Sequence, residues 1–181
     1  MFDPDSPLRV RVMHVGKPVT IDTAWWRARF ASAFDRRASL FDARTTGHRW
    51  IHGESDGWPG LVLDRYGSTL VLKLYTAAWL PRLGELAAMI NEKLAPEAIV
   101  LRLSRNIQII AQKNFRVADG ILLHGSLVDS KVIFEEMGLR FEAEVVRGQK
   151  TGFFLDQREN RRKVGALAVG REVLNAFSFT G

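Results

Sequence analysis

The chain has 181 residues and a formal net charge of +6, with 46% hydrophobic and 25% charged residues, which is the composition of a globular protein with a packed core. It contains no cysteine, so disulfides, iron–sulfur clusters and a thiolate nucleophile are excluded within these residues. The excess of Lys and Arg favours a polyanionic partner, of which nucleic acid is the commonest. A basic protein without such a partner is the alternative.

The sequence shows no sign of membrane insertion or export. No apolar run approaches the ~20 residues that a membrane-spanning helix needs. The first five residues carry acids and a proline, where a secretory signal has basic residues followed by an apolar stretch. We therefore expect a cytoplasmic location.

The beginning of the chain predicts one strand and one helix. Residues 6–13 alternate apolar and basic side chains, the pattern of a half-buried strand. Asp22 or Thr23 can cap a helix that runs from Ala24 to about Leu40. Arginines of this helix could touch phosphate, although a solvated helix face is the commoner role.

Residues 48–75 predict a β-meander whose last two strands are joined by a tight turn at Gly67-Ser68. The predicted strands cover residues 48–52, 61–66 and 69–75. The loop between the first two contains Glu54 and Asp56, which could form a carboxylate pair for acid–base chemistry. Because Gly and Pro surround them, we favour turn-building and backbone-capping roles.

A helix over residues 80–94 and a buried strand over residues 98–103 follow, and complete a small α+β domain of about residues 45–125. The basic stretch 102–118 could form a surface patch. Phe115 within it could stack on a base, although a lone aromatic more often packs in a core.

The last part of the chain predicts a second hairpin, from residues 131–136 and 139–146, with one buried face. A basic turn between glycines comes next, then two aromatics, and then a basic helix from Gln157 to Ala168. Val173 starts a further strand.

The histidines do not predict a metal site. Only His48 and His52 are close in sequence, and residues four apart on a strand lie ~13 Å from one another. They would not bind one ion without a bend in the chain.

Three motifs stand in order along the chain. They are HGESDGWPGLVLDRY at residues 52–66, GQKTGFFLDQR at residues 148–158 and VLNAFSFTG at residues 173–181. The set resembles the class I S-adenosylmethionine-dependent rRNA methyltransferases of the RlmI type, which modify carbon 5 of a cytosine in large-subunit rRNA. The resemblance covers nearly the whole chain, and the third motif alone would be weak. It implies S-adenosyl-L-methionine as cofactor and large-subunit rRNA as partner.

The resemblance also implies a division into domains. Residues 1–20 would be the remnant of an RNA-binding PUA domain, residues 22–125 a central α+β domain of meander plus helices, and residues 130–181 the start of an α/β Rossmann-like methyltransferase domain. Cytosine carbon 5 is activated by addition of a thiolate, and the cofactor-binding turn breaks off at Gly181. We therefore expect this chain alone to be catalytically incomplete.

Site residues follow from the resemblance as two sets, with no catalytic residue in either. The cofactor would be met by Thr151, Phe153, Asp156, Gln157, Asn175, Phe177, Thr180 and Gly181. RNA would be met by Lys150, Arg158, Arg161 and Arg162. At least one of Phe153 and Phe154 is assigned to core packing, and two of the four basic residues could instead belong to a solvated helix face.

Two other functions stay open. The chain could be a non-catalytic RNA-binding module, because it is basic and compact. It could also belong to an enzyme of the same architecture that methylates a guanine nitrogen.

Overall fold

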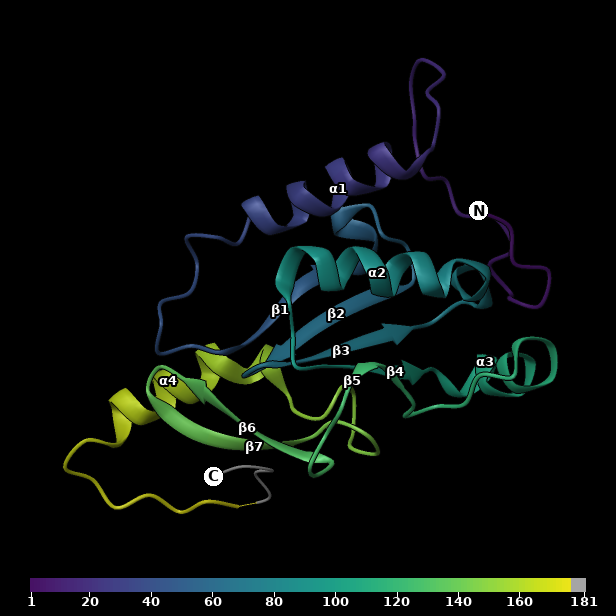
Figure 1. The fold of residues 1–181 in the computed structure, drawn as a ribbon. Coiled ribbons are helices and arrows are strands. Elements are labelled where there is room, and N and C mark those ends of the chain that lie inside the picture. Colours follow the sequence, from purple (N-terminus) through teal and green to yellow (C-terminus); the bar gives the residue numbers. More distant parts are fainter. Residues whose placement is uncertain (177–181) are drawn as a thin grey trace.

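A five-stranded mixed sheet lies at the centre of the protein, of which this computed structural model describes residues 1–176 (Figure 1). The strands follow one another across the sheet in the order β1-β2-β3-β4-β5. They are β1 (Gly47–His52), β2 (Leu61–Tyr66), β3 (Thr69–Leu74), β4 (Ala98–Leu103) and β5 (Leu122–Gly125). Only β3 and β4 pair in parallel. A parallel pair needs a crossover, and helix α2 (Leu83–Leu94) provides it.

Helices α1 (Thr23–Asp35) and α2 cover one face of the sheet (Figure 1). The face beneath them is apolar because alternate residues of a strand point the same way, and Leu63, Leu72 and Leu101 lie in one register row with no exposed surface. Three tryptophans meet in this core with ring centroids 5.1–5.6 Å apart; they are Trp26, Trp58 and Trp79.

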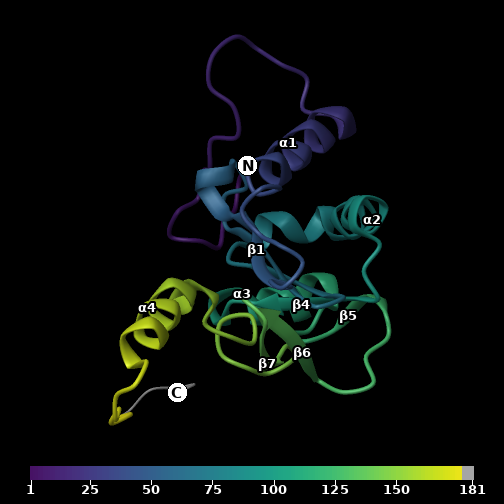
Figure 2. The same ribbon diagram turned by 90° about the vertical axis from the view of Figure 1, so that its left-hand side faces the viewer.

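The opposite face of the sheet carries a second layer (Figure 2). It consists of the hairpin β6 (Lys131–Glu136) and β7 (Leu139–Glu144), the segment that follows it, and helix α4 (Arg158–Ala168). Its smaller core joins sheet residues to the added layer through Tyr66, Val71, Val100, Phe134, Ala143, Val145, Phe153 and Leu155. Since both faces of the sheet are covered, β4 is buried along its whole length.

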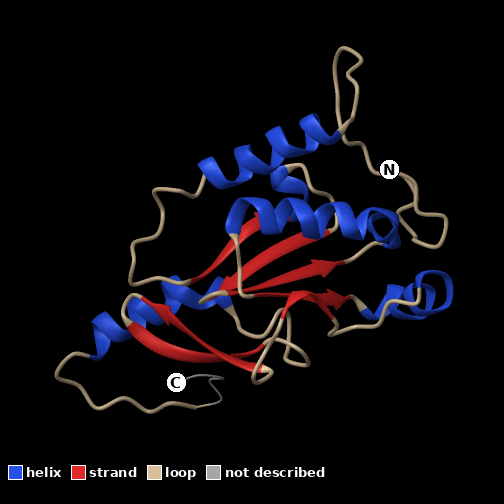
Figure 3. Ribbon diagram, in the orientation of Figure 1, coloured by secondary structure: helices blue, strands red, loops and turns tan. Residues whose placement is uncertain are grey.

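Shorter helices connect these elements (Figure 3). Helix α3 (Arg105–Ile110) continues into a π-helical turn at Ala111–Phe115. Turns of 3₁₀-helix lie at Gly53–Asp56, Ala77–Arg82 and Leu155–Gln157. Among the described residues, none of the helices combines the length and the apolar character that crossing a membrane requires.

The predicted meander, the second hairpin and the three longer helices are confirmed. The Asp22 carboxylate caps α1 by accepting a hydrogen bond of 2.8 Å from the Trp25 amide. This helix ends at Asp35, not near Leu40, and turns follow it.

The first predicted strand was wrong, and the described part of the last one is not a strand. Within residues 6–13, Val10 forms an isolated bridge with Phe2. Residues 173–176 have no regular structure, and the rest of that predicted strand lies outside the described residues. A segment of alternating apolar and polar residues forms a strand only where a neighbouring strand offers hydrogen bonds. In the first stretch Met13 packs into the main core, but Val12 is 70% exposed; in the second, Leu174 is 92% exposed. The division into domains stays a prediction.

Candidate functional site

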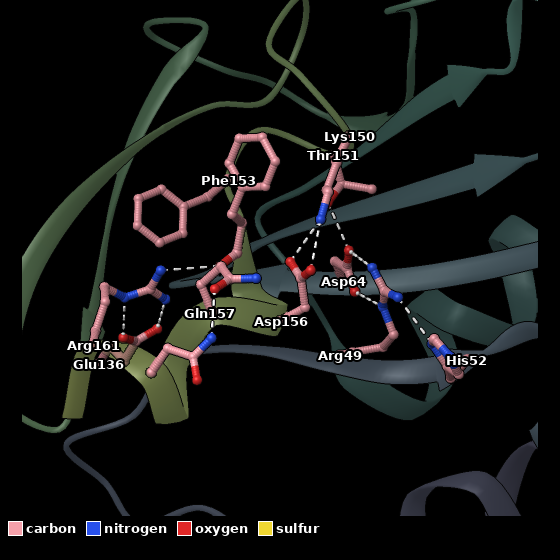
Figure 4. Close-up of polar contacts among 12 residues, drawn as sticks. Arg49, His52, Asp64, Glu136, Lys150, Thr151, Phe153, Asp156, Gln157 and Arg161 are labelled. Atoms are coloured by element: carbon pink, nitrogen blue, oxygen red, sulfur yellow. Dashed lines mark hydrogen bonds and ion pairs between the residues drawn. The ribbon is translucent and has the colours of Figure 1, made fainter. Parts of the chain in front are cut away.

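Residues 147–157, here called the anchored segment, lie across the face of the sheet that α1 and α2 leave free (Figure 4). Its turn needs unusual backbone angles, with φ of +53° at Lys150 and +130° at Gly152. Gly148 donates a hydrogen bond of 3.0 Å to the Glu144 carbonyl, and a Cβ at this position would lie 2.2 Å from that oxygen. Only glycine fits there.

Thr151 fixes the turn to strand β2. Its hydroxyl donates to Asp64 Oδ2 at 2.6 Å. Since that uses the only hydrogen of the threonine, the Tyr66 hydroxyl, 2.8 Å away, is the donor to Thr151 Oγ1. Burial, together with the negative charge of Asp64, raises the pKa of Tyr66 and keeps the phenol protonated for this bond.

Asp64 is fully buried and forms a two-bonded ion pair with Arg49, at 2.7 and 2.9 Å. Burial acts to lower the pKa of Arg49, but the hydrogen bonds and charge of Asp64 outweigh it and the pKa is raised. Arg49 also contacts His52 Nδ1 at 2.9 Å, because a bulge between Arg49 and Ile51 turns both side chains to one face. A chain of contacts thus runs from His52 to Thr151 (Figure 4).

Two cations of the sheet bind carbonyls of the anchored segment and of the residues just before it. Arg102 donates to the carbonyls of Val145 and Gly148 at 3.3 and 3.0 Å. Lys73 donates to the Lys150 carbonyl at 2.6 Å. Burial, with the nearby charge of Arg102, lowers the pKa of Lys73. Arg102 is therefore not part of the predicted surface patch at residues 102–118, because it is buried and pairs with Asp119.

The outer edge of the anchored segment is polar and exposed. The Lys150 ammonium contacts both carboxylate oxygens of Asp156 at 2.7 and 2.8 Å and lies 4.4 Å from the Phe154 ring centre. The hydrogen bond from Lys150 lowers the pKa of Asp156. Gln157 is also exposed and accepts a hydrogen bond from Asn160.

The predicted cofactor residues therefore fall into separate groups. Asp156 and Gln157 present polar side chains to solvent, whereas Thr151 and Phe153 are only 1% and 2% exposed. Phe153 packs against Phe134 and Phe141, which confirms that one of the two neighbouring phenylalanines is core. Asn175 is exposed. The remaining three lie outside the described residues: Phe177, Thr180 and Gly181.

The predicted RNA residues also differ in their surroundings. Arg161 is held by a two-bonded ion pair with buried Glu136, at 2.7 and 2.6 Å, and fixes α4 to the hairpin (Figure 4). Arg158 lies over the Phe41 ring at 4.5 Å. Lys150 and Arg162 have exposed side chains. Lys150 pairs with Asp156 in the anchored segment, and Arg162 pairs with Glu159 in α4.

The predicted structural role of Glu54 and Asp56 is confirmed. Asp56 accepts the His52 amide at 2.6 Å and pairs with the arginines after α1. Glu54 accepts the Gly60 amide at 3.0 Å. Within residues 1–176 no group of three or more acidic or histidine side chains is placed to hold a metal ion.

Sequence reasoning missed the sheet residues that hold the anchored segment. Asp64, Lys73 and Arg102 each follow a run of at least three apolar residues within a strand. A charge in such a place is costly unless it is paired, so this position was the signal that could have found them.

Comparison with known proteins gives the family. A family model described as S-adenosylmethionine-dependent methyltransferase matches residues 29–181. The chain belongs to this family. It is 54% identical over 186 residues to a ribosomal RNA large subunit methyltransferase of Deinococcus radiodurans, which covers 100% of the chain and 45% of that protein. A ribosomal RNA large subunit methyltransferase I of Shewanella amazonensis is 36% identical over 97% of the chain and 44% of its own length.

The chain thus spans less than half the length of these curated relatives. Among solved structures, a putative SAM-dependent methyltransferase from Streptococcus mutans has a TM-score of 0.67 at 21% identity, over 82% of this chain and 37% of that one. A putative methyltransferase complexed with SAH gives 0.68 at 21% identity, over 82% and 36%. At this identity the likeness shows the fold alone.

Proposed function

We propose that this chain is part of an enzyme that transfers the methyl group of S-adenosylmethionine to large-subunit ribosomal RNA. The 54% identity along the whole chain to a relative of that name carries the proposal. The net charge of +6 supports a polyanionic substrate. Because the relatives are more than twice as long, the activity is proposed for a polypeptide that contains this chain, and the 181 residues alone are expected to give no turnover.

Within this proposal the anchored segment forms one wall of the cofactor site. The exposed carboxylate of Asp156 and amide of Gln157 suit the hydroxyl and ammonium groups of S-adenosylmethionine, which supplies an activated methyl group when bound. Thr151 and Phe153 act from beneath by fixing the segment to the sheet and the hairpin. Asn175 and the final residues Phe177, Thr180 and Gly181 complete the proposed set.

The proposed target atom is carbon 5 of a cytosine, on the strength of the three motifs. The exposed cations Lys150 and Arg162 are the proposed phosphate contacts near the cofactor wall, with Arg158 beside them. Arg161 supports this surface through Glu136.

A chimera tests the proposal. This chain replaces the matching segment of the Deinococcus relative, and the product is incubated with labelled S-adenosylmethionine and large-subunit rRNA that lacks the modification. We expect 5-methylcytidine in the nucleoside digest from the chimera and none from the 181-residue chain. Methylguanosine would support the guanine enzyme, and a folded chimera that binds RNA without incorporation would support the binding module.

The cofactor wall has its own test in the same chimera. Asp156→Ala should raise the KM for S-adenosylmethionine about tenfold, since a hydrogen bond to a charged group contributes ~1.5–3 kcal/mol. Glu159→Gln, which changes a neighbouring exposed acid, is the control and should leave the KM unchanged. An unchanged KM in Asp156→Ala would remove this residue from the site.

A further inference from the structure

One row of residues crosses the sheet beside the anchored segment. His52, Val62, Lys73 and Arg102 are register partners on β1, β2, β3 and β4. Because alternate residues share a face, this row points to the same side as Asp64. The Arg102 end is buried beneath the anchored segment, whereas His52 at the other end is exposed.

Four polar side chains gather at the exposed end of this row: Arg49, His52, Lys73 and Tyr75, here called the polar strip. Tyr75 follows β3 two residues after Lys73, so it shares its face, and the Lys73 ammonium lies 5.5 Å from its ring centre. Arg49 contacts His52. His52 pairs in register with Val62, and Val62 pairs with Lys73 on the next strand.

The Tyr75 ring is a fixed and accessible flat surface. It is 44% exposed, while its amide donates to the Gly60 carbonyl at 2.8 Å and its carbonyl accepts from Asn106. Within residues 1–176 the Tyr75 hydroxyl has no hydrogen-bond partner. An exposed aromatic ring on a rigid backbone offers a stacking surface to a planar group.

The two cations beside this ring are held in place and are partly buried. Asp64 fixes the Arg49 guanidinium, whose side chain is 29% exposed. The Lys150 carbonyl fixes Lys73. Partial burial and the charge of Arg102 disfavour the charged form of Lys73 and lower its pKa, so an anion placed there would offset both effects.

We propose that the polar strip binds one unpaired nucleotide of single-stranded RNA, with its base on Tyr75 and its phosphate at Arg49 and Lys73. The proposal rests on the proposed function and deepens it by naming the strand form and the surface. A duplex hides its base faces, so only an unpaired base can stack on a side chain. The strip adjoins the proposed cofactor wall, because Lys73 bonds the Lys150 carbonyl and Lys150 pairs with Asp156.

The first experiment measures affinity. A fluorescein-labelled single-stranded pyrimidine octaribonucleotide is titrated with the 181-residue chain and followed by fluorescence anisotropy. Tyr75→Ala should weaken binding by about 5-fold to 100-fold, as expected for loss of one stacked base, and Tyr75→Phe should retain it. Lys73→Gln should reduce the slope of log affinity against log salt by about 0.7, the value for one phosphate on a single strand.

Matched controls lie elsewhere on the surface. Phe115→Ala removes an aromatic ring with 38% exposure, close to that of Tyr75. Lys93→Gln removes an exposed cation from α2, on the other face of the sheet. Neither should change affinity. A larger loss in Phe115→Ala than in Tyr75→Ala, or equal competition by the same sequence as a duplex, would overturn the proposal.

Cross-linking of the unmodified chain gives an independent answer if a variant fails to fold. Irradiation with 4-thiouridine-containing single-stranded RNA should label the tryptic peptide that contains Tyr75; labelling confined to other peptides would contradict the strip. The methylation chimera separates the two proposals. Full methylation by the Tyr75→Ala chimera, with unchanged RNA affinity, would overturn the strip alone. RNA binding at Tyr75 without any methylation would overturn only the enzymatic function.

Discussion

The two faces of the five-stranded sheet are built from neighbouring residues of the same strands, yet they differ: the face under the helices is apolar, whereas the other combines a smaller apolar core with buried charges. Under the helices, Leu63, Leu72 and Leu101 form an apolar row. One residue along, on the other face, Asp64 and Arg102 bind the anchored segment through hydrogen bonds. Both sets are buried, so burial alone does not distinguish a core from a site.

This difference has a physical consequence. Apolar burial is non-directional and grows with the area removed from water, so the helix face can supply stability without defining one backbone path. Hydrogen bonds require fixed distances and angles, so the polar face can hold the turn at residues 147–152 in one conformation. The helix face stabilises the fold, and the polar face positions the proposed site.

The largest expected effect is on the helix face. Trp58 has no exposed surface and packs against two other tryptophans. Trp58→Ala should lower the free energy of unfolding by about 3–5 kcal/mol, as lost burial and a cavity combine. Urea denaturation measures it. Leu174→Ala, at a side chain 92% exposed, should change stability by less than about 0.5 kcal/mol. A small loss in Trp58→Ala would show that the helix face is not the main source of stability.

A smaller but localised effect is expected on the polar face. Asp64→Ala leaves Arg49 without its ion pair and Thr151 without its acceptor. We expect the free energy of unfolding to fall by about 3 kcal/mol. This is the low end of the range for breaking a buried ion pair, because Arg49 is partly exposed. Hydrogen exchange should speed up at the amides of Gly148 and Gly152.

The control for Asp64→Ala is Asp42→Ala, which breaks an exposed pair with Arg44 and should cost less than about 1 kcal/mol. Uniform acceleration of exchange across β3 and β4 would contradict the division between the two faces, because it would mean that Asp64 stabilises the whole fold.

The smallest effect depends on pH and concerns the edge of the helix face. Burial, then the charge of Arg65, lowers the pKa of His48 from 6.5 to about 4. Its ring nitrogens have no hydrogen-bond partner in the described part of the chain. The unfolded chain therefore takes up a proton that the folded chain does not, and stability present above pH 6.5 is lost as pH falls toward 4.

Because of this residue, the free energy of unfolding should fall by about 2 kcal/mol between pH 7 and pH 5. His48→Phe keeps a ring stacked on Phe41 and should remove that part of the pH dependence, measured as the difference in urea unfolding between the two proteins. His124→Gln, at an exposed histidine, should leave the dependence unchanged. If the free energy of unfolding changed with pH equally in His48→Phe and in the unchanged protein, His48 would be excluded as the source of the pH dependence.

The elements of the fold were largely predictable from local patterns. The turn signal at Gly67-Ser68 identified β2 and β3, helical spacing with an Asp22 cap identified α1, and alternation identified β7. The same rule failed for residues 6–13, where alternation exists without a partner strand. In the candidate site, the motif at residues 148–158 and one core phenylalanine within it were predicted, but the burial of Thr151 was not.

The sequence by itself determined which segments form strands and helices, because periodicity and capping act between residues a few positions apart. It also indicated the family, through motifs that are continuous in the chain. Only the tertiary structure decided which charges are buried partners and which are free. Thr151 and Asp64 are separated by 87 residues, and Arg102 and Gly148 by 46. Such pairs arise from the way two layers pack on one sheet, and no local pattern encodes that.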